Sequence, residues 1–595
     1  MKAFLQGILS SALGFGLAVA ASLVCLLVLV AALGSRGEKP VGQGSYLVIG
    51  NGLVVTEAPD DGMRTLGSLL SGGEGETVDL FRALEAIDLA AKDPAIAGIL
   101  VTDGLGAGLT ARGELRSALR SFRAAGKPVV AWTEGATVGS YYLAAAADTV
   151  ALHPMGEVSF AGLAANGTYL GKALSELGIG VQVTRVGKYK SAVEPFTQDR
   201  MSPEAKAQSQ EMLDEVWERL VAAVAADRKI PPARLAEIGA SPGHYPAPQA
   251  LKLGLVDKVL HRDELIALLL ERGGKADKEG SFRHVGLAKY AGKVRLPRGS
   301  GGTLAVVYAE GEIVDGMGGP GMIGGDRLAG TLRRLRQDDD VKAVVLRIDS
   351  PGGSAFASEI IHRELELLSR KGVVLVASMG DTAASGGYYI AAPARAILAD
   401  PLTITGSIGV FGLHFNYGAL AARFSVGTDG VKTAPFADLL ENHRPATEAE
   451  MAVVQSSVDA VYETFLGVVA RGRKVPRDAV HAVAQGRVWT GSQARKAKLV
   501  DRFGGLRDAI ALAAEEAGLK EGYRLTESPA LGEAKAGLAE MLLGDDEPAP
   551  VFAGAAQDPA LRLLRDQWKV VEGLRRLNDR RGIYLLAPVD GVEAR

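Results

Sequence analysis

The feature that most constrains this chain is a pattern that occurs twice. Tyr141-Tyr-Leu-Ala-Ala145 is matched by Tyr388-Tyr-Ile-Ala-Ala392, and Gln249-Ala-Leu-Lys-Leu-Gly-Leu-Val-Asp257 is matched by Gln493-Ala-Arg-Lys-Ala-Lys-Leu-Val-Asp501. These and other pairs keep the same order and an offset of about 245 residues. A sustained offset with matched order indicates tandem duplication of a whole domain, so one fold has to serve both halves.

Each half alternates short apolar strands with amphipathic helices. We expect helices at 79–91, 113–125, 326–335 and 359–369, and strands beginning at 96, 129, 341 and 373. This alternation is typical of an α/β fold with mostly parallel strands.

Four regions follow one another along the chain. We expect an N-terminal membrane anchor at 1–45, a first domain at 46–295, a second domain at 296–540 and a C-terminal extension at 541–595. Residues 287–301 are rich in Gly, Lys and Arg and are interpreted as a connecting segment. Residues 544–559 are acidic, with Pro and Ala, and are interpreted as a loop or disordered stretch.

The stretch from Phe4 to Leu33 is almost wholly apolar and carries no charge. At roughly thirty residues it is long enough to span a bilayer with tilt. The apolar part of a cleaved signal peptide is only roughly 7–15 residues long, so we expect a retained single-pass anchor. No other segment is long and apolar enough to span, which places the remaining chain on one side of the membrane.

Composition excludes several classes of function. The net charge of -3 gives no basic field for nucleic acid. Cys25 is the single cysteine, so no internal disulfide and no cysteine-based metal site can form. We expect no metal and no cofactor.

Ser385 lies where a predicted strand turns into a predicted helix. The apolar run Gly372-Val-Val-Leu-Val-Ala-Ser378 precedes it, and from Tyr388 the chain becomes a small-residue run typical of a buried helix. A helix start stabilises developing negative charge, and the amide of Gly386 can point at an oxyanion. From this stretch alone, close packing of small residues is an equally good interpretation.

Bare backbone amides are expected beside this serine turn. Asp349-Ser-Pro-Gly-Gly-Ser354 follows a predicted strand, opposite Ala107-Gly108 of the first half. We expect Gly352, Gly353 and Gly386 to form an oxyanion hole.

The two halves differ in a complementary way at the residues that would do chemistry. Aligning the two Tyr-Tyr pairs places Val138 opposite Ser385. Aligning Gly187 with Gly430 places Lys190 opposite Thr433. One half therefore has the lysine without the serine, and the other has the serine without the lysine. This indicates one composite site between the halves, with Lys190 as the base. The alternative is an ordinary surface lysine.

Histidine is the other common base for a serine. None of the eight stands in a setting that would aim it at the serine turn, and most are interpreted as surface or core residues: His153, His244, His261, His284, His362, His414, His443 and His481.

Four motifs together resemble the signal peptide peptidase A family, in the long (protease IV) form of these membrane-anchored bacterial serine proteases. They are Thr382-Ala-Ala-Ser-Gly-Gly-Tyr388, Asp349-Ser-Pro-Gly-Gly353, Thr405-Gly-Ser-Ile-Gly409 and Tyr189-Lys-Ser-Ala-Val-Glu-Pro195. The resemblance covers nearly the whole chain after the anchor.

The resemblance implies a Clp protease/crotonase-like fold in each half, with Ser385 as nucleophile and Lys190 as general base. It implies a homotetramer enclosing a bowl, anchored in the inner membrane with a periplasmic catalytic body. The implied substrates are remnant signal peptides and other hydrophobic peptides. Ser407 is expected either to orient the lysine or to be only a turn serine.

Two other functions fit parts of this pattern. A crotonase-type acyl-CoA enzyme also holds an oxyanion with two backbone amides, but it would need catalytic carboxylates and neither Ser385 nor an anchor. A non-catalytic membrane scaffold would have been free to lose Ser385, Lys190 and the glycine pair, which are all present.

Overall fold

The computed structural model describes residues 40–59, 76–519, 522–529 and 583–587. The apolar stretch of the expected anchor and the acidic stretch at 544–559 lie outside these residues. Within the described ranges, no helix combines the length and the apolar character needed to cross a bilayer.

The first domain is built on a seven-stranded sheet, parallel except at β8. Its strands run in the order β10 (His284–Gly286), β1 (Ser45–Ile49), β4 (Ile96–Val101), β5 (Val129–Ala136), β6 (Thr149–Ser159) and β8 (His244–Pro246), with β9 (Lys258–Val259) also paired to β6. A separate parallel pair is formed by β2 (Val54–Thr56) and β3 (Thr77–Asp79).

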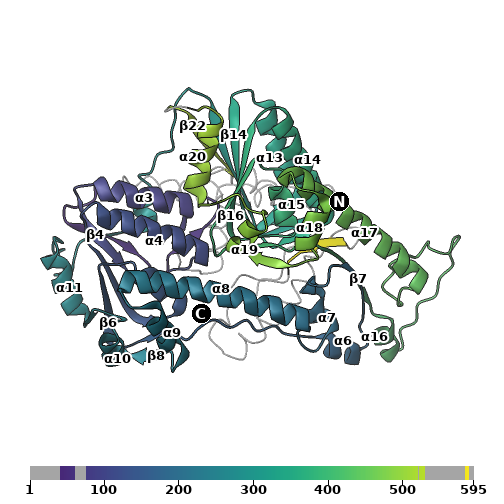
Figure 1. The fold of residues 1–595 in the computed structure, drawn as a ribbon, viewed down its shortest axis with the longest axis horizontal. Coiled ribbons are helices and arrows are strands. Elements are labelled where there is room, and N and C mark those ends of the chain that lie inside the picture. Colours follow the sequence, from purple (N-terminus) through teal and green to yellow (C-terminus); the bar gives the residue numbers. More distant parts are fainter. Residues whose placement is uncertain (1–39, 60–75, 520–521, 530–582, 588–595) are drawn as a thin grey trace, which may run out of the picture.

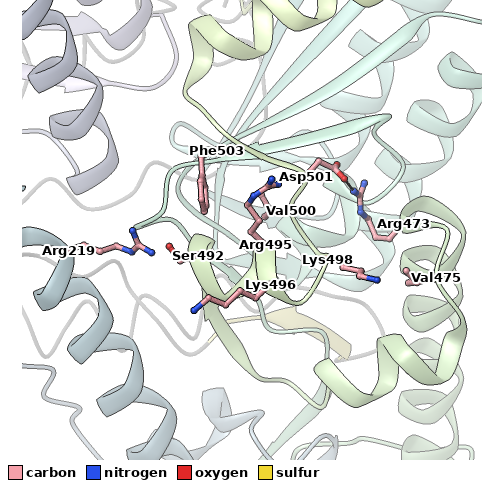
Figure 2. A pocket seen from close by; sticks show the side chains of 10 residues that line it. All are labelled: Arg219, Arg473, Val475, Ser492, Arg495, Lys496, Lys498, Val500, Asp501 and Phe503. Carbon is pink, nitrogen blue, oxygen red and sulfur yellow. Dashed lines mark hydrogen bonds and ion pairs between the residues drawn. The ribbon is translucent and has the colours of Figure 1, made fainter. Parts of the chain in front are cut away.

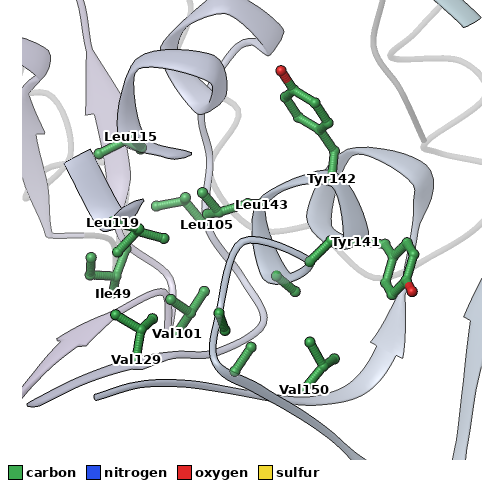
Figure 3. Packing of buried hydrophobic residues seen from close by; sticks show 14 of the residues in the cluster. Ile49, Val101, Leu105, Leu115, Leu119, Val129, Tyr141, Tyr142, Leu143 and Val150 are labelled. Carbon is green, nitrogen blue, oxygen red and sulfur yellow. The ribbon is translucent and has the colours of Figure 1, made fainter. Parts of the chain in front are cut away.

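Helices cover both faces of this sheet. They are α3 (Leu80–Lys92), α4 (Leu109–Ala124), α5 (Val138–Ala144), α8 (Pro203–Arg228), α9 (Pro232–Ala240), α10 (Ala247–Lys252), α11 (Arg262–Glu271) and α12 (Leu287–Ala291). Leu115 and Leu119 of α4 pack on Ile49 and Val129 of the strands, as Figure 3 shows. On the opposite face, Leu265 and other residues of α11 complete a second cluster.

The second domain repeats this plan with an eight-stranded sheet. Its strands run in the order β20 (Val488–Thr490), β18 (Ile404–Gly406), β16 (Val374–Ala384), β14 (Val341–Ser350), β11 (Thr303–Glu310) and β22 (Arg524–Ser528), with β17 (Ala396–Ala399) and β21 (Arg502–Phe503) branching from β16. Its helices are α13 (Gly325–Gln337), α14 (Ala355–Arg370), α15 (Gly386–Ala391), α16 (Gly418–Arg423), α17 (Glu448–Arg473), α18 (Arg477–Val483), α19 (Gly491–Lys496) and α20 (Leu506–Glu516). The prediction of a duplicated α/β unit is confirmed.

A segment of the first half crosses to the second domain. It contains α6 (Gly171–Leu177), β7 (Gly180–Val186), the 3₁₀-helix η1 (Ser191–Val193) and α7 (Glu194–Thr197). Strand β7 pairs antiparallel with β19 (Val410–Asn416) along its whole length. In Figure 1 this segment lies beneath the second domain, and α8 returns from it to the first domain. The crossover carries Lys190 into the other half.

A third, six-stranded sheet joins the crossover to the second domain. Its order is β13 (Met322–Gly324), β12 (Glu312–Val314), β15 (Gly352–Ser354), β23 (Ile583–Leu586), β19 and β7. Strand β23 comes from the expected C-terminal extension, yet it is an inner strand of this sheet.

The expected connecting segment at 287–301 is only partly a connection. Its first five residues form α12, because Leu287, Tyr290 and Ala291 fall at helical spacing and bury one face in the core of the first domain. The Tyr290 hydroxyl also donates to Asp93 Oδ2 at 2.8 Å.

A buried polar network joins the two domains. Arg347 on β14 is 1% exposed and donates to Glu57 of the first domain at 2.8 Å (Nε–Oε2) and 3.1 Å (Nη2–Oε1). Its Nη2 also donates to Glu114 Oε1 on α4 at 3.2 Å. Such a buried charge is tolerated only with its partners in place, so the network fixes how the domains meet.

Candidate active site

Ser385 occupies the predicted junction between β16 and α15. Its backbone has φ 55° and ψ −113°, a conformation that non-glycine residues rarely adopt. The Ser385 amide donates to the Gly406 carbonyl at 2.8 Å, and the Ser385 carbonyl accepts from the Tyr389 amide at 2.8 Å. Val138, the counterpart of Ser385 in the first half, does not have a positive φ. At this turn, the strained backbone is found only in the half that carries the serine.

Lys190 reaches Ser385 from the loop after β7. Its Nζ lies 2.8 Å from Ser385 Oγ, and both residues have no solvent exposure. The same nitrogen lies 3.1 Å from both the carbonyl oxygen and the Oγ of Ser407. Ser407 is also buried and has a positive φ of 50°. The structure thus brings together the three side chains that the sequence singled out.

Two glycines let the Lys190 side chain pass. A methyl group on Gly486, whose φ is +75°, would lie 2.6 Å from the Lys190 amide nitrogen and 2.7 Å from its Cβ. A methyl group on Gly409 would lie 3.2 Å from Lys190 Cδ. Gly409 belongs to the motif Thr405-Gly-Ser-Ile-Gly409, whereas Gly486 was not singled out in the sequence, because it approaches the lysine only through the tertiary fold.

Burial lowers the pKa of Lys190 well below its ordinary value. Desolvation disfavours the ammonium form, and in this pocket the lysine nitrogen has serine oxygens as its neighbours. A neutral amine has a lone pair that can accept a proton, and Ser385 Oγ is the hydroxyl within reach.

The glycine pair before α14 lies at the serine turn. A methyl group on Gly352 would come within 2.7 Å of the Gly386 nitrogen, and both Gly352 and Gly353 have positive φ, at +103° and +150°. The Gly352 amide donates to Ser350 Oγ at 3.2 Å. The missing side chain of Gly352 is what allows this close approach to Gly386. The expected oxyanion hole of Gly352, Gly353 and Gly386 stays a prediction.

A protein-family model described as peptidase family S49 matches residues 121–274 and 368–520, one stretch in each half. The chain belongs to this family. Its resemblance to signal peptide peptidase A is thereby confirmed, and the protein is a serine peptidase of family S49.

Known relatives cover most of this S49 peptidase. Protease 4 of Salmonella typhi is 38% identical over 502 residues, which are 82% of this chain and 80% of that protein. The chloroplastic serine protease SPPA of Arabidopsis thaliana is 32% identical over 501 residues, 82% of this chain and 72% of that protein. Among solved structures, ClpP1 from Listeria monocytogenes is 13% identical with a TM-score of 0.22, over 36% of this chain and 94% of that chain.

Further residues of the S49 peptidase hold the lysine loop, and sequence reasoning missed them. Gln208 on α8 donates through Nε2 to the Tyr189 carbonyl at 3.3 Å and to Ser191 Oγ at 3.4 Å. Its Oε1 accepts from the Val488 amide at 3.2 Å. One glutamine thus ties the loop around Lys190 to the second domain, and no spacing in the sequence marks it.

A cavity separate from the dyad lies between α8 and the second domain. Figure 2 shows its lining, and its volume is about 630 Å³. Five of the lining residues are basic: Arg219, Arg473, Arg495, Lys496 and Lys498. Arg473 is paired with Asp501, and the guanidinium of Arg495 lies 5.4 Å from the centre of the Phe503 ring. Neither Ser385 nor Lys190 lines this cavity.

Proposed function

We propose that this S49 peptidase is a membrane-bound endopeptidase with a Ser385/Lys190 dyad, acting on remnant signal peptides and other hydrophobic peptides. The observation that carries the proposal is the 2.8 Å contact between Lys190 Nζ and Ser385 Oγ in a site without solvent exposure. Nucleophile and base are then within hydrogen-bond reach, and the base is held by Ser407.

The proposed reaction uses the neutral lysine as base and then as acid. Lys190 takes the proton of Ser385 Oγ while that oxygen attacks the peptide carbonyl carbon. The amides of Gly353 and Gly386 stabilise the oxyanion. Lys190 then gives the proton to the leaving amine, and water hydrolyses the resulting ester. A lysine that stayed charged could not perform the first step, so burial is part of the mechanism.

The preference for hydrophobic peptides rests on the lining of the third sheet. Val193, three residues after Lys190, and Phe411 on β19 are buried together, with Val183 and Leu413 packed against them. This apolar cluster, which Tyr584 of β23 completes, adjoins the lysine loop and supports a preference for hydrophobic peptides.

Membrane attachment is part of the proposal and rests on the apolar stretch from Phe4 to Leu33. We propose an inner-membrane location with a periplasmic body. Protease protection of spheroplasts tests the orientation: added protease should degrade the body without cell lysis, whereas degradation only after lysis contradicts it.

We also propose a homotetramer built by repeating the crossover between protomers. The second-half counterpart of the crossover, at 417–453, extends outward at the right of Figure 1 and exposes Phe424, Val426 and Val431 at 74%, 58% and 103%. Residues 161–169, the first-half counterpart of β19, are partly exposed coil. Joining these two surfaces gives a head-to-tail contact, which closes into a four-membered ring when successive protomers are related by a quarter turn. Light scattering of the Phe424→Asp/Val426→Asp variant should show smaller particles than the wild type.

The decisive experiment is hydrolysis of a hydrophobic peptide ester by the full chain in detergent, beside Ser385→Ala and Lys190→Ala. Activity that disappears in both variants supports the dyad. Activity that survives Lys190→Ala would return the histidines to consideration. A folded oligomer without activity would favour the scaffold or the acyl-CoA enzyme.

A further inference from the structure

The cavity of about 630 Å³ between α8 and the second domain carries an excess of positive charge. Five basic side chains line it, and within the described part of the chain the only acidic side chain among its lining residues is Asp501. Figure 2 shows Arg219 on α8 and the other basic residues on the second domain. Like charges that converge on one hollow repel one another, so an anion bound between them relieves the repulsion.

The duplication supplies an internal reference for this cavity. Arg473 is the last residue of α17 and pairs with Asp501, and Arg228 is the last residue of α8 and pairs with Asp257 at 2.7 Å. Each aspartate also accepts a backbone amide of its own domain. The arginine–aspartate pair is therefore part of the duplicated fold, and it does not by itself mark a binding site.

Two of the basic residues occur only in the second half. The repeated Gln-Ala motif aligns the halves residue by residue, and it places Arg495 opposite Leu251 and Lys498 opposite Gly254. The guanidinium of Arg495 lies over the Phe503 ring, 5.4 Å from its centre. Neither Arg495 nor Lys498 forms an ion pair with any residue that the structure describes. These two charges are added to the duplicated fold without a structural partner.

The two arginines at opposite walls of the cavity have unused hydrogen-bond donors. In the first half, Arg228 Nε donates to the Gly254 carbonyl at 3.3 Å. Arg473, whose side chain is only 5% exposed, has a buried Nε that lacks any partner among the described residues. The same holds for Arg219 Nε, although its Nη2 pairs with Glu215 at 3.2 Å. A buried donor without an acceptor is unfavourable, and an oxyanion is the kind of acceptor that both groups lack.

We propose that this cavity binds a phosphate-bearing anion, held chiefly by Arg495 and Lys498. Phosphate offers several acceptor oxygens and more than one negative charge, which suits a set of guanidinium and ammonium groups better than a single carboxylate does. The cavity is larger than a lone phosphate and falls in the range of about 300–1000 Å³ that is typical of small-molecule sites. The phosphate therefore belongs to a larger group, either a soluble polyphosphate or the head group of an anionic phospholipid.

The test is calorimetric titration of the full chain in non-ionic detergent, with inorganic pyrophosphate and separately with dioctanoyl phosphatidylglycerol. The variant Arg495→Leu/Lys498→Gly installs the residues that fold at the same places in the first half, and it should bind the tighter probe at least about tenfold more weakly. The control Lys229→Gly/Lys252→Leu also removes two exposed positive charges, at the ends of α8 and α10, and should keep the wild-type affinity. Tighter binding of pyrophosphate indicates a soluble ligand, and tighter binding of the lipid indicates a head group.

Thermal unfolding gives a second measurement if the double variant is poorly behaved in titration. The bound probe should raise the Tm of the wild type and of the control, and it should leave the Tm of the single variant Lys498→Gly less changed. Failure of both probes to bind the wild type overturns the inference, and so does equal binding by the wild type and Arg495→Leu/Lys498→Gly. Because binding and not hydrolysis is measured, and neither Ser385 nor Lys190 lines the cavity, the result is independent of the proposed peptidase function.

Discussion

Lys190 Nζ lies 2.8 Å from Ser385 Oγ although the two residues belong to different halves of a duplicated chain. The contact exists because β7 of the first half pairs with β19 of the second. Each half supplies one member of the dyad, so the domains must meet in one arrangement for the site to exist. The following predictions test this arrangement and its chemistry.

Replacing Lys190 with alanine should lower kcat by between about 10² and about 10⁴, because the general base is lost. Lys188→Ala is the matched control, since Lys188 is an exposed lysine two residues away in the same loop. Mixing Lys190→Ala with Ser385→Ala should not restore activity, because both residues come from one chain. Ester hydrolysis measures both effects, and recovery on mixing would contradict a dyad within one chain.

The pH dependence of kcat/KM should show a rising limb that levels off well below pH 10.5, the ordinary pKa of lysine. Desolvation lowers the pKa of Lys190, and the active form is the neutral amine. Raising the pH increases the neutral fraction, so activity rises through the lowered pKa and then stays constant. A limb that is centred near the ordinary lysine pKa would show that the amine is hydrated in solution.

Gly486→Ala should lower kcat/KM by about a hundredfold. The new methyl group would overlap the Lys190 backbone and shift the lysine amine from its position beside Ser385 Oγ. Gly372→Ala separates this effect from backbone strain, since Gly372 also has a positive φ, of +91°, but has no atom within 4 Å of the added methyl group. Both variants should lose thermal stability, Gly486→Ala more because of its added overlap with Lys190, and only Gly486→Ala should lose activity. Equal activities in the two variants would remove the packing argument.

Asp349→Asn should become more stable relative to the wild type as pH rises. Burial raises the pKa of Asp349 well above its usual value, and the nearby carboxylates of Asp381 and Glu57 add to the effect. A carboxyl group with a raised pKa gives stability that is present below its unfolded pKa and lost as pH rises through its folded pKa. Asparagine does not titrate and keeps an acceptor for the Thr382 amide, which now donates to Asp349 Oδ1 at 2.8 Å.

Thermal unfolding at about pH 5 and about pH 9 measures the difference. The surface variant Asp339→Asn is the control, because Asp339 is exposed and Lys371 lowers its pKa. A Tm difference between Asp349→Asn and the wild type that stays constant with pH would mean that Asp349 is ionised throughout this range.

Features that repeat or contrast along the chain could be predicted from the sequence. The offset between the Tyr-Tyr pairs revealed the duplication, and the mismatch of Val138 with Ser385 showed which half holds the serine. The strand before Ser385 and the helix after it followed from local patterns, because an apolar run and a small-residue run each favour one conformation.

Features made by distant packing could not be predicted in this way. Gly486 touches Lys190, and Arg347 contacts Glu57, only because two domains meet, and neither pairing has a fixed spacing. Strand β23 is the clearest case. Its five-residue apolar stretch resembles many other short strands, so the stretch itself does not identify a partner. The partner, β15, precedes it by about 230 residues, and no sequence pattern links the two.

The crossover of β7 also sets when the site can exist during synthesis. Lys190 leaves the ribosome about 300 residues before Gly486 and the loop that completes its pocket, an interval of roughly 15–60 s at about 5–20 residues per second. During that time the first domain can fold, but its lysine has no serine beside it. A nascent chain is therefore inactive toward neighbouring proteins, and proteolytic capacity begins only when the second domain has been made.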